Sequence, residues 1–362
     1  MTTTSNPLTP VFDGHNDTLL HIAKLPPDDE WSFFERNDTG AIDLPRAREG
    51  GMVGGIFAIF PPPQGKMPED AKAVSPEGGF SIPQLPRLPF EVAREFTTET
   101  MELLFELEEQ SQGEFFVARD IEMLRDGIDD GRMGAVLHFE GAEAIDEDLE
   151  FLERYYDDGL RSLGIVWSRS NAFGHGVPFR YPCSPDTGPG LTEAGGRLVQ
   201  ACNELGIMVD MAHLNEAGFW DVADLSDSPL VVSHACCHAI CPSARNITDE
   251  QLDAIGESGG LIGINFFVGD LREDGDFRRD ASVDQLVRHI DYAAQRIGID
   301  HVAFGSDFDG ARVPLELGDA SGFPVLIQSL RQAGFDEESI QKIACDNWLR
   351  VLEQSWNSPT KG

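Results

Sequence analysis

Histidines and acidic residues recur at short spacing in five segments of this 362-residue chain. The segments span residues 13–17, 137–141, 210–213, 232–234 and 305–310. They supply imidazoles and carboxylates without a thiolate, a donor set that suits zinc, manganese or a similar divalent ion. A carboxylate can bridge two ions roughly 3.5–4 Å apart that turn a shared water into hydroxide, and a further acid can carry the proton. The pattern therefore predicts a metal-dependent hydrolase.

Each segment falls at the end of a β-rich run, so strands are the elements that position it. We expect eight strands, at residues 11–17, 52–60, 134–141, 163–167, 207–213, 230–235, 261–267 and 301–307. Alternate residues of a strand point the same way, so His15 and Asp17 can reach one ion together. A lone buried histidine is usually a packed core residue, but five strands that share this feature favour a common site.

Polar stretches with helical periodicity separate the strands, at residues 148–159, 192–205, 249–257 and 283–297. Eight strand-then-helix units predict an α/β fold, a single-domain (β/α)8 TIM-type barrel over residues 1–362. Residues 61–90 contain eight of the 22 prolines, and residues 174–190 contain four prolines and four glycines. We expect both to be loop insertions at the carboxyl face of the barrel, where such enzymes keep their sites.

The composition excludes several classes of partner. Acidic residues outnumber basic ones 63 to 27, which gives a formal net charge of −36. This balance argues against binding nucleic acid or an anionic membrane surface. We expect no signal peptide, since residues 1–10 are polar, and no membrane span, since no stretch approaches the ~18 consecutive apolar residues that span a bilayer. Its six cysteines are unevenly spread, unlike a disulfide scaffold, so a cytoplasmic, reduced protein is expected.

A cysteine-rich stretch, residues 234–241, offers a different metal site. It contains two histidines and three cysteines, but no second cysteine pair elsewhere completes a tetrahedral set. We therefore expect Cys236, Cys237 and Cys241 to pack as small apolar groups. Structural roles are also expected for the histidines at positions 21, 138, 289 and 301.

Taken in order, the motifs resemble the membrane dipeptidase (renal dipeptidase, peptidase M19) family of the amidohydrolase superfamily, from about residue 13 to about residue 348. The pieces that carry the resemblance are Asp13-Gly-His-Asn-Asp17, His138-Phe-Glu-Gly141, Gly190-Leu-Thr-Glu-Ala-Gly195, Asp210-Met-Ala-His213, Ser233-His234, Ser243-Ala-Arg-Asn246 and Gly305-Ser-Asp-Phe-Asp-Gly310. Singly they are weak, but together and in order they are specific.

The resemblance implies a binuclear zinc site that hydrolyses dipeptides of the L-Xaa-L-Xaa or L-Xaa-D-Xaa kind with a bridging hydroxide. His15 and Asp17 would hold the first zinc, His213 and His234 the second, and Glu140 would bridge the two. Manganese or iron in place of zinc stays open.

Two further roles follow from the same resemblance. Arg245 matches the arginine that binds the free α-carboxylate of a dipeptide, and a guanidinium suits bidentate binding of a carboxylate. A surface ion pair is the alternative for this arginine. Asp307 matches the acid that takes the proton from the bridging water and delivers it to the leaving amine. Asp309 is expected behind the ligands or in the turn.

The chain departs from the family at the fourth strand. Vertebrate members end it with a histidine that polarises the scissile carbonyl, and Trp167 stands there instead. Asn171 or His175, in the loop just downstream, are our candidates for a substrate-binding donor, and the second zinc alone is the alternative. The vertebrate cysteines and lipid-anchor tail are missing as well. Because the family often forms homodimers, a second copy is an expected partner besides the dipeptide.

Two other functions compete with dipeptide hydrolysis. The first is another amidohydrolase reaction, such as deacylation of an N-acyl amino acid or opening of a lactone, because a metal centre senses only the scissile carbonyl. A requirement for a free α-amine on the substrate separates a dipeptidase from these other hydrolases. The second is a non-catalytic zinc-binding barrel. Trp167, in place of the family's histidine, leaves this function open, whereas the intact ligand set and Asp307 argue against it.

Overall fold

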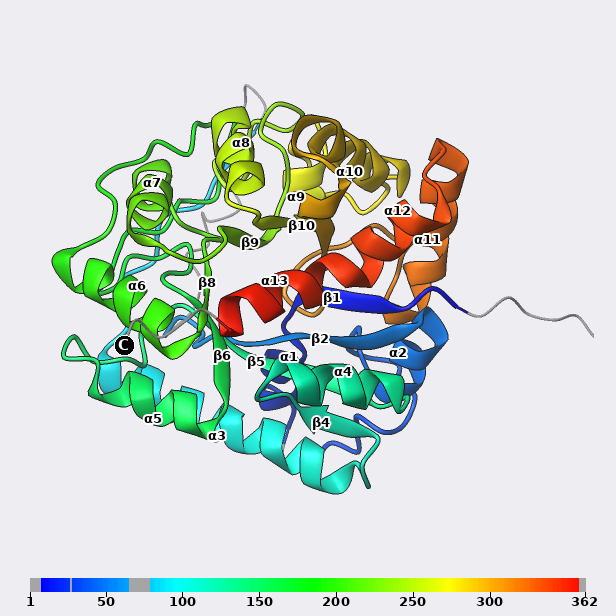
Figure 1. Ribbon diagram of the computed structural model, residues 1–362, viewed down its shortest axis with the longest axis horizontal. Helices are drawn as coiled ribbons and strands as arrows, with labels where there is room; N and C mark the ends of the chain where they lie inside the picture. Colours follow the sequence, from blue (N-terminus) through cyan, green and yellow to red (C-terminus); the bar gives the residue numbers. More distant parts are fainter. Residues whose placement is uncertain (1–7, 27, 65–78, 358–362) are drawn as a thin grey trace, which may run out of the picture.

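The centre of the molecule is a parallel barrel of eight strands surrounded by helices (Figure 1). The structure is a computed structural model and describes residues 8–26, 28–64 and 79–357. The barrel strands are β1 (Val11–Asn16), β2 (Met52–Ile59), β5 (Met133–Glu140), β6 (Leu160–Gly164), β8 (Met208–Asp210), β9 (Val231–Ala235), β10 (Leu261–Asn265) and β11 (Val302–Gly305). Their residues are almost all buried, as is typical of a parallel sheet covered on its outer face by helices. The predicted (β/α)8 fold is confirmed.

The first and last strands meet at their carboxyl ends. The backbone N–H of Asp307 donates to the carbonyl of His15 at 2.9 Å, and that of Asp17 donates to Phe308 at 2.8 Å. The Ser306 hydroxyl adds a hydrogen bond to the Asp13 carboxylate at 2.7 Å. Closure therefore brings the amino-terminal and carboxyl-terminal motifs of the sequence together.

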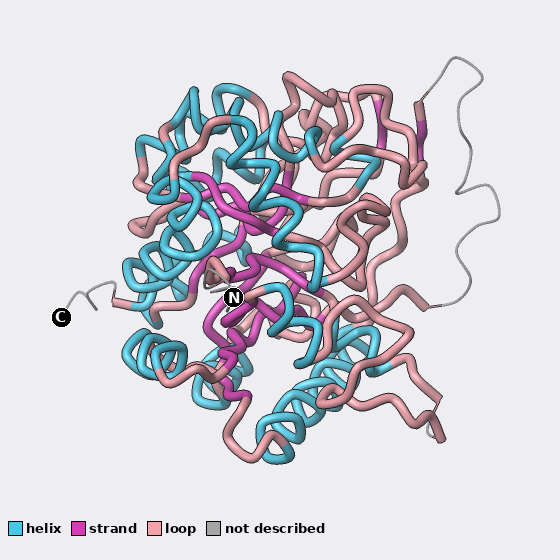
Figure 2. Tube along the Cα trace, turned by 90° about the vertical axis from the view of Figure 1, so that its right-hand side faces the viewer, coloured by secondary structure: helices cyan, strands magenta, loops and turns pink. Residues whose placement is uncertain are grey.

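The helices lie around the strands, and most of the long loops gather on one side of the molecule (Figure 2). The helices are α1 (Thr18–Ala23), α2 (Leu44–Gly50), α3 (Phe90–Gln110), α4 (Ile121–Asp129), α5 (Glu150–Asp158), α6 (Glu193–Leu205), α7 (Glu216–Leu225), α8 (Asp249–Glu257), α9 (Val268–Leu271), α10 (Asp284–Ile297), α11 (Phe323–Ala333), α12 (Glu337–Gln341) and α13 (Asn347–Trp356). The four helical stretches expected from periodicity match α5, α6, α8 and α10 to within two residues.

Helix α13 crosses the barrel in Figure 1, and its apolar residues pack against the amino-terminal ends of the strands. Its Trp348 is fully buried among Phe12, Met208 and Leu261, which come from three different strands. The indole N–H donates to the carbonyl of Phe304 at 2.8 Å. The amino-terminal end is thereby packed, and the carboxyl ends of the strands are left for chemistry.

The observed strand limits differ from the expected ones, and four strands differ by two residues or more at one end. The fourth, expected at residues 163–167, is β6 at Leu160–Gly164, because the apolar residues that follow are buried in a loop rather than paired. The seventh ends at Asn265, two residues before its expected end, and the fifth and eighth also end earlier than expected, at Asp210 and Gly305. Beyond them His213 and Asp307 have φ angles of 67° and 58°, in the left-handed region that a strand does not tolerate.

The two predicted insertions contact each other. A short strand β3 (Phe80–Ser81) from the first pairs antiparallel with β7 (Arg180–Tyr181) from the second, and the rings of Phe80 and Tyr181 stack 6.0 Å apart. Residues 65–78 of the first insertion lie outside the described residues. Two elements were not predicted from the sequence: helix α3, which begins at the end of this insertion, and strand β4 (Phe115–Val117), which pairs with β5.

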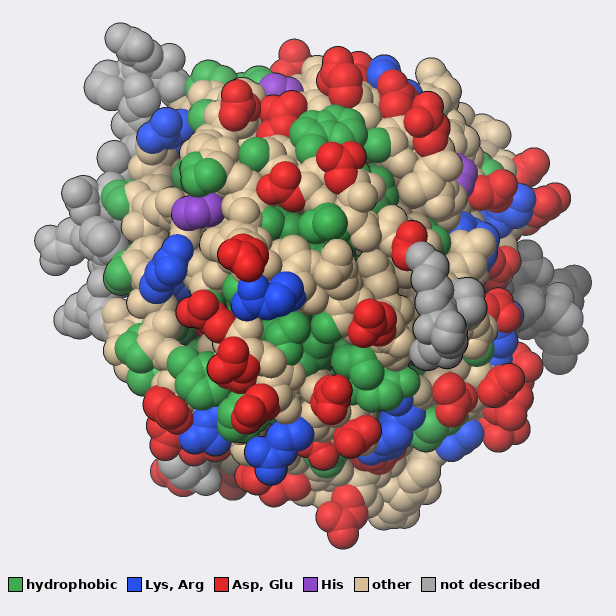
Figure 3. All heavy atoms as spheres, turned by 60° about the vertical axis from the view of Figure 1, so that its left-hand side comes forward, with side chains coloured by type: hydrophobic (Ala, Val, Ile, Leu, Met, Phe, Trp, Pro, Cys, Tyr) green, Lys and Arg blue, Asp and Glu red, His purple; other side chains and the backbone are tan. Residues whose placement is uncertain are grey.

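Acidic side chains are spread over the face shown in Figure 3, with basic ones among them. Several form exposed ion pairs, such as Arg296 with Asp253 at 2.6 Å. Among the helices that the structure describes, none has the length and apolar character needed to cross a membrane.

Candidate metal centre

The five predicted ligands meet at the carboxyl ends of the barrel strands. They come from the end of β1, from β5, from β9 and from the turn after β8, and all are buried: His15, Asp17, Glu140, His213 and His234. Because parallel strands end at one edge, residues far apart in the chain become neighbours here.

Glu140 lies at the middle of the cluster. Its Oε1 is 2.9 Å from Nε2 of His213, 3.5 Å from Nε2 of His234 and 3.8 Å from Nε2 of His15. Nε2 of His15 is in turn 3.7 Å from Oδ2 of Asp17. Two groups of potential ligand atoms result, one with His15 and Asp17 and one with the two other histidines, and Glu140 belongs to both. A carboxylate in this place can bridge two ions.

The residues themselves fit a divalent metal. Both ring nitrogens of His15 and Oδ1 of Asp17 are buried without a hydrogen-bond partner. Buried polar atoms almost always have a partner, so unpartnered ones that converge indicate a ligand. Imidazole and carboxylate donors without a thiolate are typical of zinc and manganese sites.

Burial sets the charge of the histidines. It lowers the pKa of His213 and of His234 well below the ordinary value, so both rings are neutral and able to bind a metal. Burial also lowers the pKa of His15, but the carboxylates of Glu140 and Asp17 outweigh it and raise that pKa to about 10. Burial raises the pKa of Glu140 itself. A cation bound between these groups would take the place of the proton on His15.

Two serines hold the second pair of histidines. The Ser168 hydroxyl is 2.7 Å from Nδ1 of His213, and the Ser233 hydroxyl is 2.8 Å from Nδ1 of His234. A bond at Nδ1 fixes the ring and directs Nε2 toward Glu140. Neither serine was predicted as a site residue. Ser233 precedes a predicted ligand, but Ser168 lies in a loop with no sequence signal.

Asp307 lies at the rim of the same cluster. Its Oδ2 accepts a 3.0 Å hydrogen bond from the Asn265 amide at the end of β10. Burial raises its pKa to about 7, against the opposing effect of His15. A Cβ on Gly310 would overlap the Asp17 carboxylate, so only glycine lets this turn approach the cluster. The turn thereby places Asp307 beside the predicted ligands.

Asp309, expected behind the ligands or in the turn, is held in the turn. Its carboxylate accepts from the backbone N–H of Ala41 at 2.7 Å. It thus ties the turn to the segment before α2.

Arg245 is buried, contrary to the alternative of a surface ion pair. Its guanidinium donates to the carbonyl of His234 at 3.1 Å, and its Nε has no partner. Through that carbonyl it is attached to the backbone of a predicted ligand. A buried guanidinium with a free donor is suited to an anionic group.

The loop after β6 contains Asn171 and His175, the two candidates for a substrate-binding donor. The Asn171 amide donates to the carbonyl of Ile165 at 2.8 Å, and its oxygen accepts from two backbone N–H groups of the loop. Its side chain therefore shapes the loop. His175 is half-buried and contacts the Ser170 hydroxyl at 3.1 Å. No described contact brings either residue to the ligands.

Trp167 forms an aromatic wall beside the cluster. Its ring centroid lies 4.7 Å from that of Phe60, 5.3 Å from Phe179 and 5.7 Å from His213. Behind it the buried Arg169 pairs with Glu143 at 2.9 Å.

The cysteines of the 234–241 stretch are buried thiols. Those of Cys236 and Cys241 lie near the carbonyls of Asn265 and Gly269. Burial raises the pKa of Cys236 well above its ordinary value. Among the described residues, the groups that could hold a metal ion contain no cysteine.

A parallel barrel with a buried histidine–carboxylate cluster at the carboxyl ends of its strands defines a metallohydrolase of the amidohydrolase type. Residues 7–360 match the family described as membrane dipeptidase (peptidase family M19). The chain belongs to this family, whose activity is metal-dependent hydrolysis of dipeptides.

Similar proteins include solved metallopeptidases. A metallopeptidase from Rhodobacter sphaeroides, bound to a phosphinate mimic of the dipeptide L-Ala-D-Ala, is 45% identical, with a TM-score of 0.92 over 97% of this chain and 100% of that one. The dipeptidase AC, a metallopeptidase of family M19, is 46% identical, with a TM-score of 0.90 over 97% of this chain and 99% of that one. An uncharacterized protein from the pqqA 5′ region of Klebsiella pneumoniae is 47% identical over 66% of this chain and 87% of its own length.

Proposed function

We propose that this chain is a binuclear zinc dipeptidase that cleaves L-Xaa-L-Xaa and L-Xaa-D-Xaa dipeptides. The observation that carries the proposal is the place of Glu140, whose Oε1 lies within 3.8 Å of three imidazole nitrogens from two ligand groups. His15 and Asp17 would hold one zinc, His213 and His234 the other, and Glu140 both. When bound, two such ions supply Lewis acidity and a hydroxide at neutral pH.

The chain supplies the proton transfer through Asp307. Hydrolysis of an amide adds water across the C–N bond, so one proton must move from the attacking water to the leaving amine. A carboxyl group with a pKa of about 7 can accept a proton and release it near neutral pH. Its Oδ2 accepts the hydrogen bond from Asn265, and Oδ1 would take the proton.

The chain limits the substrate through Arg245. A buried guanidinium with an unpartnered Nε can bind the free α-carboxylate of the second residue. Because Arg245 is fixed to the backbone of His234, the scissile bond one residue away falls at the ligand cluster. A longer peptide has an amide where this carboxylate belongs, so the arginine selects for dipeptides.

The D configuration of the second residue is supported by the Rhodobacter sphaeroides relative, whose phosphinate ligand mimics L-Ala-D-Ala. The proposal also includes a cytoplasmic location and a homodimer. Six free cysteines, five of them buried, agree with a reducing compartment. The homodimer rests on the family resemblance, and light scattering of the purified protein tests it.

Amino-acid release from a panel of L,L- and L,D-dipeptides by zinc-loaded protein tests the activity, with N-acetylated dipeptides and dipeptide amides as controls. We expect release from the free dipeptides alone. Release only from acylated substrates would make the protein a deacylase. Two bound zinc ions without release from any amide would favour a non-catalytic barrel.

A further inference from the structure

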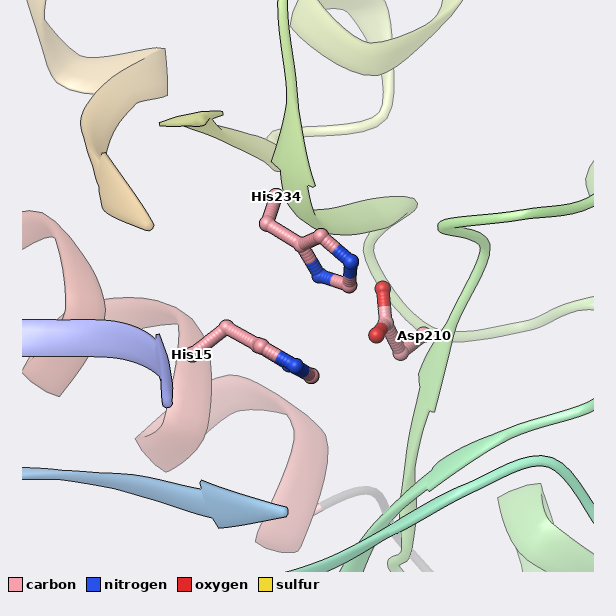
Figure 4. A group of neighbouring side chains, drawn as sticks. All are labelled: His15, Asp210 and His234. Atoms are coloured by element: carbon pink, nitrogen blue, oxygen red, sulfur yellow. The ribbon is translucent and has the colours of Figure 1, made fainter. Parts of the chain in front are cut away.

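Asp210 lies beneath the candidate metal centre and is not one of the predicted ligands. It ends strand β8 and is 1% exposed. Figure 4 shows its carboxylate facing the imidazole rings of His15 and His234, which come from β1 and β9. The two rings lie nearly one above the other, with centroids 3.8 Å apart. Asp210 thus faces one proposed ligand from each of the two metal positions.

The hydrogen bonds of Asp210 distinguish it from a ligand. Its Oδ1 accepts from the backbone N–H groups of Ala212 at 3.0 Å and of Ser233 at 2.8 Å. Its Oδ2 accepts from the Ser233 hydroxyl at 2.5 Å. In contrast, Oδ1 of Asp17 is buried without a partner. The acceptors of Asp210 are occupied by the protein, whereas those of a proposed ligand are free.

These bonds determine where the proton of His234 lies. A carboxylate only accepts, so the Ser233 hydroxyl donates its one hydrogen to Asp210. The same hydroxyl oxygen, 2.8 Å from Nδ1 of His234, must then accept a hydrogen from that nitrogen. A neutral imidazole that carries its hydrogen on Nδ1 leaves Nε2 free. Nε2 is the atom that faces Glu140 at 3.5 Å.

We infer that Asp210 is a positioning residue that acts through Ser233 to hold His234 in the tautomer that binds metal. The inference rests on the metal centre of the proposed function. It assigns the group of His15, Asp210 and His234 to orientation of the ligands rather than to a third metal site. Asp210, Ser233 and His234 form a hydrogen-bonded relay. All three residues are buried, so water does not compete for these hydrogen bonds.

The substitution Asp210→Asn reverses the relay with little change in shape. The amide oxygen must stay where two backbone N–H groups donate, so the amide NH2 faces Ser233. The Ser233 oxygen then accepts, and its hydroxyl turns to donate to Nδ1 of His234. The hydrogen of the imidazole moves to Nε2 and blocks the metal-binding atom. Ser233→Ala removes the relay altogether.

The experiment compares wild type, D210N, S233A and the double variant, first by zinc affinity against a chromophoric chelator. We expect the affinity of one of the two ions to fall 10- to 100-fold in each single variant. The double variant should lose no more than the single ones, because both remove the same relay. Ser111→Ala is the matched control, since Ser111 is buried and its hydroxyl bonds only backbone groups remote from the cluster.

Histidine-labelled, metal-free protein gives a second readout by 15N NMR. We expect protonation of His234 at Nδ1 in wild type and at Nε2 in D210N. This measurement needs no metal, so it tests the relay separately from the proposed function. The proposed function fails if the wild-type protein binds fewer than two ions. Wild-type affinity and an unprotonated Nε2 in both single variants would overturn the inference. Three ions in wild type and two in D210N would overturn it as well, because Asp210 would then be a ligand.

Discussion

The Asn265 amide donates a 3.0 Å hydrogen bond to Oδ2 of Asp307, joining the end of β10 to the turn after β11. The bond crosses between neighbouring strands of the barrel, which pair in parallel up to Asn265 and Gly305. It holds a carboxylate whose own backbone is in the left-handed region, with φ of 58°. Such conformations cost about 1–3 kcal/mol and persist where the surroundings enforce them. Asn265 is therefore part of what places the proposed proton carrier.

Removing this carboxylate should abolish catalysis and spare the metal. For Asp307→Asn we expect kcat to fall roughly 10²–10⁴-fold, the usual contribution of a positioned acid or base, with unchanged zinc content. Asn265→Ala keeps the carboxylate and loses one charged hydrogen bond, so a smaller loss of roughly 10- to 100-fold is expected. Dipeptide kinetics and metal analysis measure both. Loss of zinc from D307N would instead make Asp307 a ligand.

The role of Arg245 can be tested by changing the carboxyl end of the substrate. Wild type should prefer a dipeptide to its carboxyl-terminal amide, because only the former presents an anion to the buried guanidinium. Arg245→Met should lower kcat/KM for the free dipeptide roughly 10- to 100-fold, the range for a charged hydrogen bond. It should leave the rate with the amide nearly unchanged. Equal losses on both substrates would assign Arg245 to the folding of β9 and its turn.

Metal removal should lower stability as well as activity. Without a cation, the negative charge of the buried carboxylates of Asp17 and Glu140 is offset by His15 and, for Glu140, also by Arg245. An ion that binds only the folded chain adds about 2.7–4 kcal/mol at 100 to 1,000 times its dissociation constant. We expect a chelator to lower the melting temperature, and zinc to restore it. Identical melting curves with and without chelator would count against a metal centre.

His289 predicts how stability depends on pH. It is buried, with Nδ1 accepting from the backbone of Cys237 at 3.0 Å and Nε2 facing the carbonyl of Leu271 at 2.9 Å. Burial lowers its pKa from 6.5 to about 4. Because the unfolded chain binds this proton more readily, the contribution is complete above pH 6.5 and is lost as the pH falls toward 4.

The full effect is about 3–4 kcal/mol, because the pKa of His289 falls from 6.5 to about 4 and each pKa unit corresponds to about 1.4 kcal/mol. Urea unfolding at pH 4.5 and 7 measures it, with His289→Gln as the comparison. Glutamine can accept and donate in the same places but does not titrate, so the variant should show a flatter pH dependence. The difference between the two proteins isolates His289 from other titrating groups. Parallel pH profiles would show that His289 is not responsible.

The buried pair of Arg169 and Glu143 behind Trp167 predicts a stability effect. Both side chains are at most 2% exposed, and their atoms are 2.9 Å apart. Arg169→Met leaves an unpaired buried carboxylate and should cost about 3–5 kcal/mol. The double variant R169M/E143L should recover much of this. Arg36→Met, from an exposed pair with Glu49, is the control and should cost about 0–1 kcal/mol.

The amino-acid sequence alone predicted the barrel and predicted that five candidate ligands lie at one edge of it. It could do so because alternation along a strand and the shared direction of parallel strands are local properties. Helix periodicity likewise placed α8 within its observed bounds. The roles of these five residues stay predictions, but the structure gathers them as expected.

Tertiary structure decided which residues stand behind the ligands. Ser168 approaches His213 across 45 positions, and Asn265 approaches Asp307 across 42. In the folded chain the Asn171 side chain bonds inside its own loop, and the fourth strand lies three residues closer to the amino terminus than expected. Periodicity and residue type do not predict such pairs, because a hydrogen bond between distant segments depends on where the closed barrel places the two segments.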